Sequence, residues 1–390
     1  MSATVQLQLL VPGLCGPLPD NKQLEHDPVL IRLFNTLARA RVATGEENNV
    51  IEKGNAVEKD NAVEKANGYA LLSTLFAMHV SAEFPAAALS LSAYLQYKPA
   101  DMLFGSTADI AHYLQAGYYF LHADPVHLRV EMDHAILQSP ADLQLTPAET
   151  IAFCEQQQAH FSADGIHFFA TDASHCYVCI KKPQLLHTTC LQHAIGRNIH
   201  FILPAGEDAI YWKQFLNESQ MLLFNHPANQ HREQTGQLTL NSLWLHGGGC
   251  LPAAESRGTT DIDLVCANDF LLAGLADYFK IPWCEIDDIK AGNWSVDFYR
   301  HIKNYRKPLL YFDCLLPWLH YTDTQMWQQQ VNLFYQYCLL PLLVLVRQGK
   351  LNIDLYPLND TMPDKKYHFH HYYACRFWRR AKIKNYVDTY

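Results

Sequence analysis

Charged residues are scarce in this sequence, and acidic ones outnumber basic ones. Asp, Glu, Lys and Arg make up 18% of the 390 residues and leave a formal net charge of −9. Without a basic excess the chain has no overall field that attracts a polyanion, so nucleic acid is not favoured as a partner. A Gly-x-Ser-x-Gly elbow and a Gly-x-x-x-x-Gly-Lys-Ser/Thr loop are also absent. These absences argue against an elbow-type serine hydrolase and against a P-loop nucleotidase.

Long hydrophobic runs are missing as well. The longest, Leu339–Val346, is far shorter than the roughly 20 residues that span a membrane, so it is predicted to be part of a core and no membrane partner is expected. No Lys or Arg precedes Pro12-Gly13, which argues against a signal peptide. The 11 Cys are scattered singly, and together these features predict reduced, buried thiols in a cytoplasmic protein.

Apolar residues, in contrast, are plentiful. The sequence is 49% hydrophobic and 12% aromatic, enough for a large core in one or two domains. Strand-like alternation and helix-like spacing follow one another along the chain, which is typical of α/β architecture. The segment Thr146-Pro147-Ala148-Glu149 has the pattern of a capping box and predicts a helix start. Strands are expected at 5–11, 126–130, 167–169, 177–180, 238–245, 309–312 and 351–355, and helices from 28 and at 209–224, 268–278 and 325–337.

Two parts of the chain differ from this core. Residues 50–67 repeat a six-residue unit around Val-Glu-Lys. Because six residues turn a helix by about 240°, the repeated Val side chains form no stripe. A solvated low-complexity insertion at 43–68 is predicted, with a dedicated binding arm as the alternative. Residues 120–206 combine strands with a helix, so they are predicted to form a smaller α+β unit inserted into an α/β domain of residues 1–119 and 207–390.

Two short motifs have ligand types that metals use. Cys176-x2-Cys179 precedes Cys190-x2-His193, an inner spacing that suits zinc. However, the odd spacing of Cys176 and Cys179 sends them to opposite faces of a strand, so a structural role is favoured. The His-rich residues 368–371 suit either a metal or a plain surface strand, and the strand is favoured.

The segment from 217 to 249 is richest in groups that bind anions. It places amide, imidazole and guanidinium groups on a helix end and a loop, followed by a Gly-rich turn whose backbone N–H groups can approach a phosphate or carboxylate. The alternative is that these groups serve helix-end hydrogen bonding and packing. The candidate ligands in this segment are Asn217, His226, Asn229, Arg232, Asn241, Gly247, Gly248 and Gly249.

Five motifs along the chain carry a family resemblance: Asp124-Pro125-Val126-His127-Leu128-Arg129, Asn217-Glu218-x-Gln220-Met221, His226-Pro227-x-Asn229-x2-Arg232-Glu233, Asn241-Ser242-Leu243-Trp244-Leu245 and Arg376-Phe377-Trp378-Arg379-Arg380. Outside the repeat, nearly the whole chain resembles the RpfE-type regulatory proteins of proteobacteria. These in turn resemble archaeal-type, cofactor-independent phosphoglycerate mutases of the alkaline phosphatase superfamily. The resemblance implies an alkaline phosphatase-like α/β domain with an inserted α+β lid. It also adds Arg129 and His193 to the candidate anion ligands.

Compared with the active mutases that it resembles, this sequence lacks several metal-binding and nucleophile segments. Active mutases begin with a strand that ends in a metal-binding Asp-Gly, whereas residues 11–13 here are Val-Pro-Gly. The Pro-Gly-Ser-Asp nucleophile segment is absent, and residues 192–194 read Gln-His-Ala where the family has Pro-His-Asp. The later metal-binding segment is reduced to Asp313 and His320. Because two-metal phosphoryl transfer needs several carboxylate and His ligands, turnover is not expected.

The leading hypothesis is a catalytically degenerate, phosphoglycerate mutase-like protein that needs no cofactor and binds a small phosphorylated or carboxylate ligand in a regulatory role. One alternative is an active metal-dependent phosphomutase or phosphohydrolase that uses Mn or Zn. A second is a regulator that binds nucleic acid through the basic stretch 376–384, although an intramolecular role is favoured for that stretch. The leading hypothesis requires convergence on one anion of Arg129, His193, His226, Asn229, Arg232 and Gly247–Gly249. If Arg232 instead paired with a local acid such as Glu233 or Glu218, the hypothesis would lose its central ligand.

Overall fold

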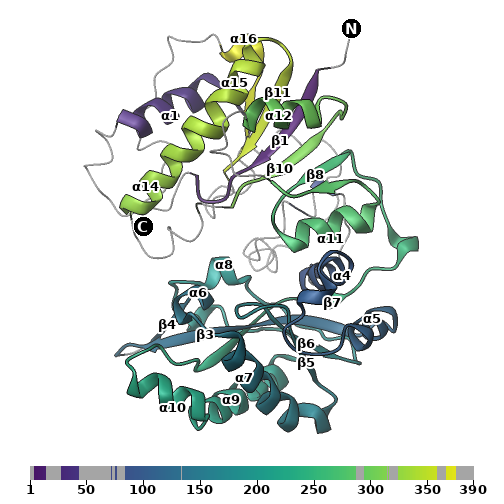
Figure 1. The fold of residues 1–390 in the computed structure, drawn as a ribbon, viewed down its shortest axis with the longest axis vertical. Coiled ribbons are helices and arrows are strands. Elements are labelled where there is room, and N and C mark those ends of the chain that lie inside the picture. Colours follow the sequence, from purple (N-terminus) through teal and green to yellow (C-terminus); the bar gives the residue numbers. More distant parts are fainter. Residues whose placement is uncertain are drawn as a thin grey trace, which may run out of the picture. The chain divides into compact units, whose positions relative to one another are not determined.

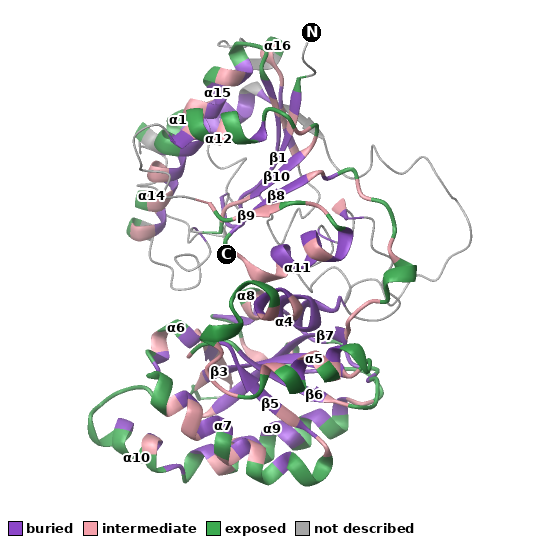
Figure 2. Ribbon diagram, turned by 45° about the vertical axis from the view of Figure 1, so that its right-hand side comes forward, coloured by how far each residue is buried: buried purple, intermediate pink, exposed green. Residues whose placement is uncertain are grey.

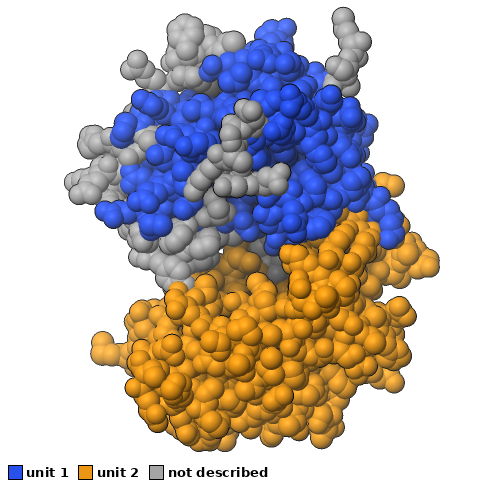
Figure 3. Space-filling model, viewed as in Figure 1, with its two compact units in different colours: residues 1–57, 260–269, 280–390 blue, residues 58–259, 270–279 orange. Residues whose placement is uncertain are grey.

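The computed structural model describes residues 4–14, 28–43, 72, 75–76, 84–132, 134–286, 294–313, 315, 324–357 and 366–374. The chain divides into two compact units, coloured separately in Figure 3. Unit 1 comprises residues 1–57, 260–269 and 280–390, and unit 2 comprises residues 58–259 and 270–279. The predicted repeat insertion, the basic stretch 376–384 and His320 lie outside the described residues.

A seven-stranded sheet forms the centre of unit 1 (Figure 1). Its order is β2-β12-β11-β1-β10-β8-β9; the pairs from β11 to β9 are parallel, whereas β12 pairs antiparallel with β11 and with β2. The central strand β1 is almost entirely buried, as an apolar strand inside a parallel sheet should be. The strands are β1 (Val5–Leu10), β2 (Arg41–Ala43), β8 (Leu264–Cys266), β9 (Trp283–Cys284), β10 (Pro308–Tyr311), β11 (Leu351–Tyr356) and β12 (Lys366–Phe369).

Helices cover this sheet and complete one apolar core. The predicted helix from Pro28 is confirmed as α1, and Leu30, Leu33, Phe34 and Leu37 on its predicted apolar face are fully buried. The helices of unit 1 are α1 (Pro28–Arg39), α12 (Trp294–Ile302), α14 (Thr324–Leu333), the π-helical η7 (Phe334–Leu339), α15 (Leu340–Arg347) and α16 (His371–Ala374).

The segments α14, η7 and α15 continue into one another as a helix from Gln325 to Arg347. Among the described helices it is the one long and apolar enough to cross a membrane by length and composition. Trp327, Phe334 and Val346 on its inner face are fully buried in the core of unit 1, while Val344 is 49% exposed. The prediction that Leu339–Val346 belongs to a core is therefore confirmed for the inner face of this helix.

An antiparallel sheet forms the centre of unit 2. Strands follow the order β4-β3-β6-β5, and β7 pairs with the long strand β3. This pairing joins residues 242–250 to the sheet that contains β3, and unit 2 includes residues 207–259 together with residues 120–206. The strands are β3 (Tyr119–Val130), β4 (Ala135–Gln138), β5 (His167–Ala170), β6 (Cys176–Ile180) and β7 (Ser242–Cys250).

Helices lie on both faces of the unit 2 sheet, whose strands are mostly buried (Figure 2). On one face α7 and α9 pack against Leu121 and Ala123; on the other α4 and α5 pack against Phe120. The helices are α4 (Ala86–Tyr97), α5 (Thr107–Gln115), α6 (Pro140–Leu143), α7 (Pro147–Phe161), α8 (Leu191–Ala194), α9 (Ala209–Phe224), α10 (Pro227–Gln234) and α11 (Phe270–Phe279), with short 3-10 turns η3 (Pro99–Asp101), η4 (Ser162–Asp164), η5 (Ile199–Phe201) and η6 (Ala254–Ser256). Together the two units confirm a mixed α/β architecture.

Candidate functional site

The guanidinium group of Arg232, the central predicted anion ligand, is used inside unit 2. Arg232 lies on α10 and is 1% exposed. Its Nε donates to the carbonyl of Leu238 at 2.6 Å, its Nη1 donates to Glu149 Oε1 at 2.9 Å, and its Nη2 donates to the carbonyl of Leu143. The predicted alternatives, Glu233 and Glu218, are not the partner. Arg232 therefore ties the start of α7 to α10, and each of its three nitrogens already has an acceptor.

Its neighbours on α10 also have internal partners. The side-chain amide of Asn229 donates to the carbonyls of Leu223 and Leu240, and its oxygen accepts the N–H of Leu240. His226 caps the helix, because its Nδ1 accepts the N–H of Ala228 at 3.1 Å. Both residues are buried. The helix-end and packing alternative thus describes α10 as the structure shows it.

The other predicted ligands have separate surroundings. Arg129 faces solvent at the end of β3 and pairs with Glu131 at 2.8 Å. Asn241 makes two hydrogen bonds with the backbone of Leu128, at 2.7 and 3.0 Å. Asn217 is exposed on α9, and His193 is half-buried on α8. An exposed Arg129 and a buried Arg232 do not share one anion, so the predicted convergence is not found.

The expected Gly-rich turn is wrong, because Gly247–Gly249 continue strand β7. Gly247 has a φ of 63°, and the pairing of β3 with β7 shifts at this point, so that one β7 residue is extra. A side chain on Gly248 would collide with Tyr119, and one on Gly249 would collide with Pro85. These glycines therefore allow a β-bulge and close packing.

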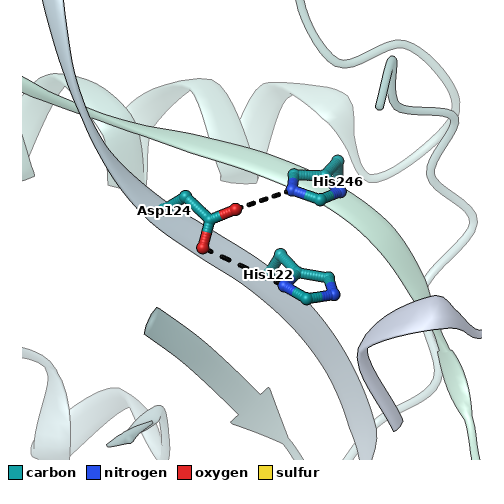
Figure 4. A group of neighbouring side chains, drawn as sticks. All are labelled: His122, Asp124 and His246. Atoms are coloured by element: carbon teal, nitrogen blue, oxygen red, sulfur yellow. Dashed lines mark hydrogen bonds and ion pairs between the residues drawn. The ribbon is translucent and has the colours of Figure 1, made fainter. Parts of the chain in front are cut away.

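The bulge has a second consequence, a buried polar cluster of His122, Asp124 and His246 (Figure 4). His122 and Asp124 are two residues apart on β3, so their side chains share a face of the sheet. The shifted register places His246 of β7 directly opposite His122. The three side chains, called the His–Asp–His cluster below, bring their ligand atoms within 4.8 Å of one another.

Asp124 links the two imidazoles. Its Oδ2 accepts a hydrogen bond from His246 Nε2 at 2.9 Å, and its Oδ1 accepts the N–H of Cys176 at 3.2 Å. The same Oδ1 lies 3.9 Å from His122 Nδ1, which is buried and has no hydrogen-bond partner. The two rings stack with centroids 4.4 Å apart and planes 3° from parallel, and Tyr177 packs against the other side of His122. The carboxylate lies between two nitrogens that point toward it.

Burial determines the charges in this cluster. Loss of solvation, followed by the nearby His246, lowers the pKa of His122 to about 3, so its imidazole is neutral at pH 7. Burial would raise the pKa of Asp124, but the hydrogen bond from His246 and the neighbouring histidines hold it below its ordinary value. The cluster therefore contains an ionised carboxylate that is 1% exposed. Among the described residues, the basic side chains within 4.0 Å of this carboxylate are the imidazoles of His122 and His246.

Two imidazoles and one carboxylate form a ligand set for divalent transition metals. The same groups could also act as an Asp-oriented general base, but exposed fractions of 7% for His122 and 4% for His246 keep a large substrate away. Of these three residues, the family motifs contain Asp124 alone, and the cluster was not predicted. Its one local signal is the His-x-Asp spacing on a strand, because His246 lies far away in the sequence.

The carboxyl ends of the parallel strands in unit 1 form a second candidate region. Asp269 follows β8 and Asp313 follows the neighbouring strand β10. Loss of solvation and then the negative charge of Asp269 raise the pKa of Asp313. At the end of β1, Val11 and Leu14 are instead fully buried, and the carbonyl of Gly13 accepts the indole N–H of Trp327 at 2.9 Å. The central strand of this sheet thus ends in apolar core.

The two short motifs have structural explanations. His368 lies on β12, the favoured strand, and its Nδ1 is 2.6 Å from Asp354 Oδ1. Cys176 packs with Cys154, whereas Cys179 packs in the group around Phe120 on the other face of the sheet. The opposite faces predicted for the two cysteines are confirmed.

Comparisons with known proteins give a partial match. No family model matches the chain. A segment of 61 residues, which is 16% of the chain and 15% of the relative, is 39% identical to a probable 2,3-bisphosphoglycerate-independent phosphoglycerate mutase of Geobacter sulfurreducens. A cofactor-independent phosphoglycerate mutase of Thermoplasma acidophilum overlays with a TM-score of 0.34 and 12% identity, covering 90% of this chain and 86% of that one. A protein of Pyrococcus horikoshii overlays with a TM-score of 0.45 and 11% identity, covering 94% and 86%. The chain is thus similar to a phosphoglycerate mutase over a short segment.

Proposed function

We propose that this chain is a phosphoglycerate mutase-like protein that has lost mutase turnover and acts in the cytoplasm by binding a small anionic ligand in a regulatory role. We infer the loss of turnover from the residues at the carboxyl end of β1. Ligands of parallel α/β sheets bind outside the carboxyl ends of the strands. There the central strand presents Val11, Gly13 and Leu14 beneath Trp327. A strand end packed in this way supplies no carboxylate for two-metal phosphoryl transfer.

The segment of 39% identity to a mutase supports a phosphorylated or carboxylate ligand. Arg232 and Asn229 are not retained as ligands, because their polar atoms are used within unit 2. Asn217 and His193 keep accessible surface, and Arg129 is 54% exposed, so each of them separately remains a candidate contact. Ligand binding should therefore be tested at these positions.

The experiment measures turnover and binding on the same tag-free protein. Interconversion of 3- and 2-phosphoglycerate and hydrolysis of p-nitrophenyl phosphate are assayed with Mn²⁺ and Zn²⁺, and 3-phosphoglycerate and inorganic phosphate are titrated by calorimetry. We expect no turnover and saturable binding that weakens about tenfold in His193→Ala, since a hydrogen bond to a charged group contributes about 1.5–3 kcal/mol. Arg347→Ala, a change in unit 1, is the control and should bind as the native protein does. Turnover that chelation abolishes would overturn the proposal, as would the absence of binding.

One observation favours a second candidate, an active metal-dependent phosphotransfer enzyme. Asp269 and Asp313 lie at the ends of neighbouring parallel strands, and the charge of the first contributes to the raised pKa of the second. Two carboxylates that repel each other are the kind of pair a divalent cation stabilises. Under this candidate, Asp313→Asn abolishes turnover while Asp297→Asn, on the exposed face of α12, leaves it unchanged.

A further inference from the structure

We infer that the His–Asp–His cluster of unit 2 binds one divalent transition-metal ion, with His122 Nδ1, an oxygen of Asp124 and His246 Nε2 as ligands, and that zinc fits it best. The inference stands apart from the proposed function, since the cluster lies in unit 2 and the strand ends of the sheet in unit 1 play no part in it. Zinc accepts imidazole and carboxylate ligands together and imposes no preferred geometry of its own.

Two other carboxylates that are largely removed from solvent each have a cation beside them. Asp354 lies 3.7 Å from the ammonium of Lys366, and Glu149 lies 2.9 Å from the guanidinium of Arg232. Asp124 is more deeply buried than either, yet no Lys or Arg pairs with it in the part of the chain that the structure describes. A buried charge is costly unless it is paired or coordinates a metal. A divalent cation would supply the missing positive charge.

The Nδ1 atom of His122 has no hydrogen-bond partner. This nitrogen is buried without a hydrogen bond and points toward Asp124 (Figure 4). Its distance of 3.9 Å from Asp124 Oδ1 is too long for a hydrogen bond. Two ligands of a tetrahedral ion with bonds of roughly 2.0–2.2 Å lie about 3.4 Å apart, so a small inward shift brings both atoms within reach of one ion. A metal ion between these two atoms would therefore satisfy both.

Binding requires a defined local movement. An imidazole nitrogen binds a metal in the plane of its ring, and the parallel stacked planes of His122 and His246 cannot both contain one ion. At least one of the two rings must turn about its Cβ–Cγ bond, a torsion with a broad energy minimum. The proton that His246 Nε2 donates to Asp124 would leave this nitrogen as the metal binds, while the N–H of Cys176 continues to hold the carboxylate in place. Three protein ligands leave the fourth tetrahedral position to water or a small ligand.

The test measures metal in tag-free protein, so that no added histidines contribute. The protein is stripped with a chelator and titrated with Zn²⁺ and with Co²⁺, and metal content is determined by mass spectrometry after gel filtration. We expect about one equivalent of Zn²⁺ and a visible Co²⁺ absorption band of tetrahedral intensity. His122→Ala and His246→Ala should each weaken binding at least 100-fold. His127→Ala, on the same strand but bonded to Thr239, is the matched control and should bind as the native protein does.

Several results of this titration would overturn metal binding by the His–Asp–His cluster. Native protein that takes up less than a tenth of an equivalent overturns it, and so does equal uptake by native protein and both alanine variants. Native protein that folds but gives only an octahedral Co²⁺ spectrum also overturns it, because that ion is not held by this set. If the alanine variants do not fold, the native titration still decides. Asp313→Asn separates the sites: metal retained in this variant belongs to unit 2, whereas metal lost belongs to the strand ends of unit 1.

Discussion

Glu149 Oε1 lies 2.9 Å from Arg232 Nη1, while the second oxygen of the same carboxylate accepts the backbone N–H of Thr146 at 2.8 Å. One side chain therefore begins helix α7 and ties it to α10. Burial would raise the pKa of Glu149, but the N–H of Thr146 and the charge of Arg232 hold it below the ordinary value. The helix start and the contact between helices are thus coupled through one carboxylate.

Removing Arg232 should leave this carboxylate without its cation. We expect Arg232→Ala to lower the free energy of unfolding by about 3 kcal/mol, because breaking one partner of a buried ion pair is strongly destabilising. Urea denaturation followed by circular dichroism measures the effect. Arg129→Ala removes an exposed pair with Glu131 and should change the free energy by less than about 0.5 kcal/mol. Equal losses in the two variants would contradict the structural role of Arg232.

Thr146 should contribute through the capping box alone. Its hydroxyl accepts the N–H of Glu149 at 3.3 Å, and the reciprocal bond completes the box. Thr146→Ala is expected to lower the free energy of unfolding by about 1 kcal/mol, and Thr146→Ser should restore most of it. The thermal midpoint of the three proteins measures this series. A serine variant no better than the alanine variant would show that the hydroxyl does not cap α7.

Asp354 should make stability depend on pH at the acidic end. Burial would raise its pKa, but the hydrogen bond from His368 and the charge of Lys366 hold the pKa below the ordinary value of 3.8. The unfolded state therefore binds the proton first as pH falls, so this contribution is complete above about pH 4 and is lost as pH drops from 3.8 through the lower folded pKa. Asp354→Asn should flatten the curve of unfolding free energy against pH in that window. Asp297→Asn, an exposed control on α12, should leave the curve unchanged.

Gly274 should be intolerant of a side chain. It lies where α11 crosses α4, and a Cβ at this position would collide with the backbone carbonyl of Leu89. We expect Gly274→Ala to lower the free energy of unfolding by about 2 kcal/mol despite the better helix propensity of Ala, since overpacking costs about 1–3 kcal/mol. Gly274→Val should cost more. A stabilised alanine variant, measured by thermal unfolding, would contradict the close crossing.

The sequence by itself determined features that depend on neighbours along the chain. Apolar alternation predicted β1, helical spacing predicted α1, the range 209–224 matched α9, and the Thr146 capping box was found where expected. Each of these rests on side chains one to four residues apart, whose relation a helix or strand period dictates. The mixed α/β class follows from the order of such elements.

Tertiary structure alone decided the rest. The pairing of β7 with β3 places residues 242–250 in the unit 2 sheet, and Gly247–Gly249, expected to form a turn, continue this strand through a bulge. The same register brought His246 opposite His122, and a distant Glu149 became the partner of Arg232. These outcomes join residues far apart in sequence, and a shift of one position in strand register reverses which side chains share a face. Local periodicity carries no information on that register, because it is determined by packing of the whole sheet.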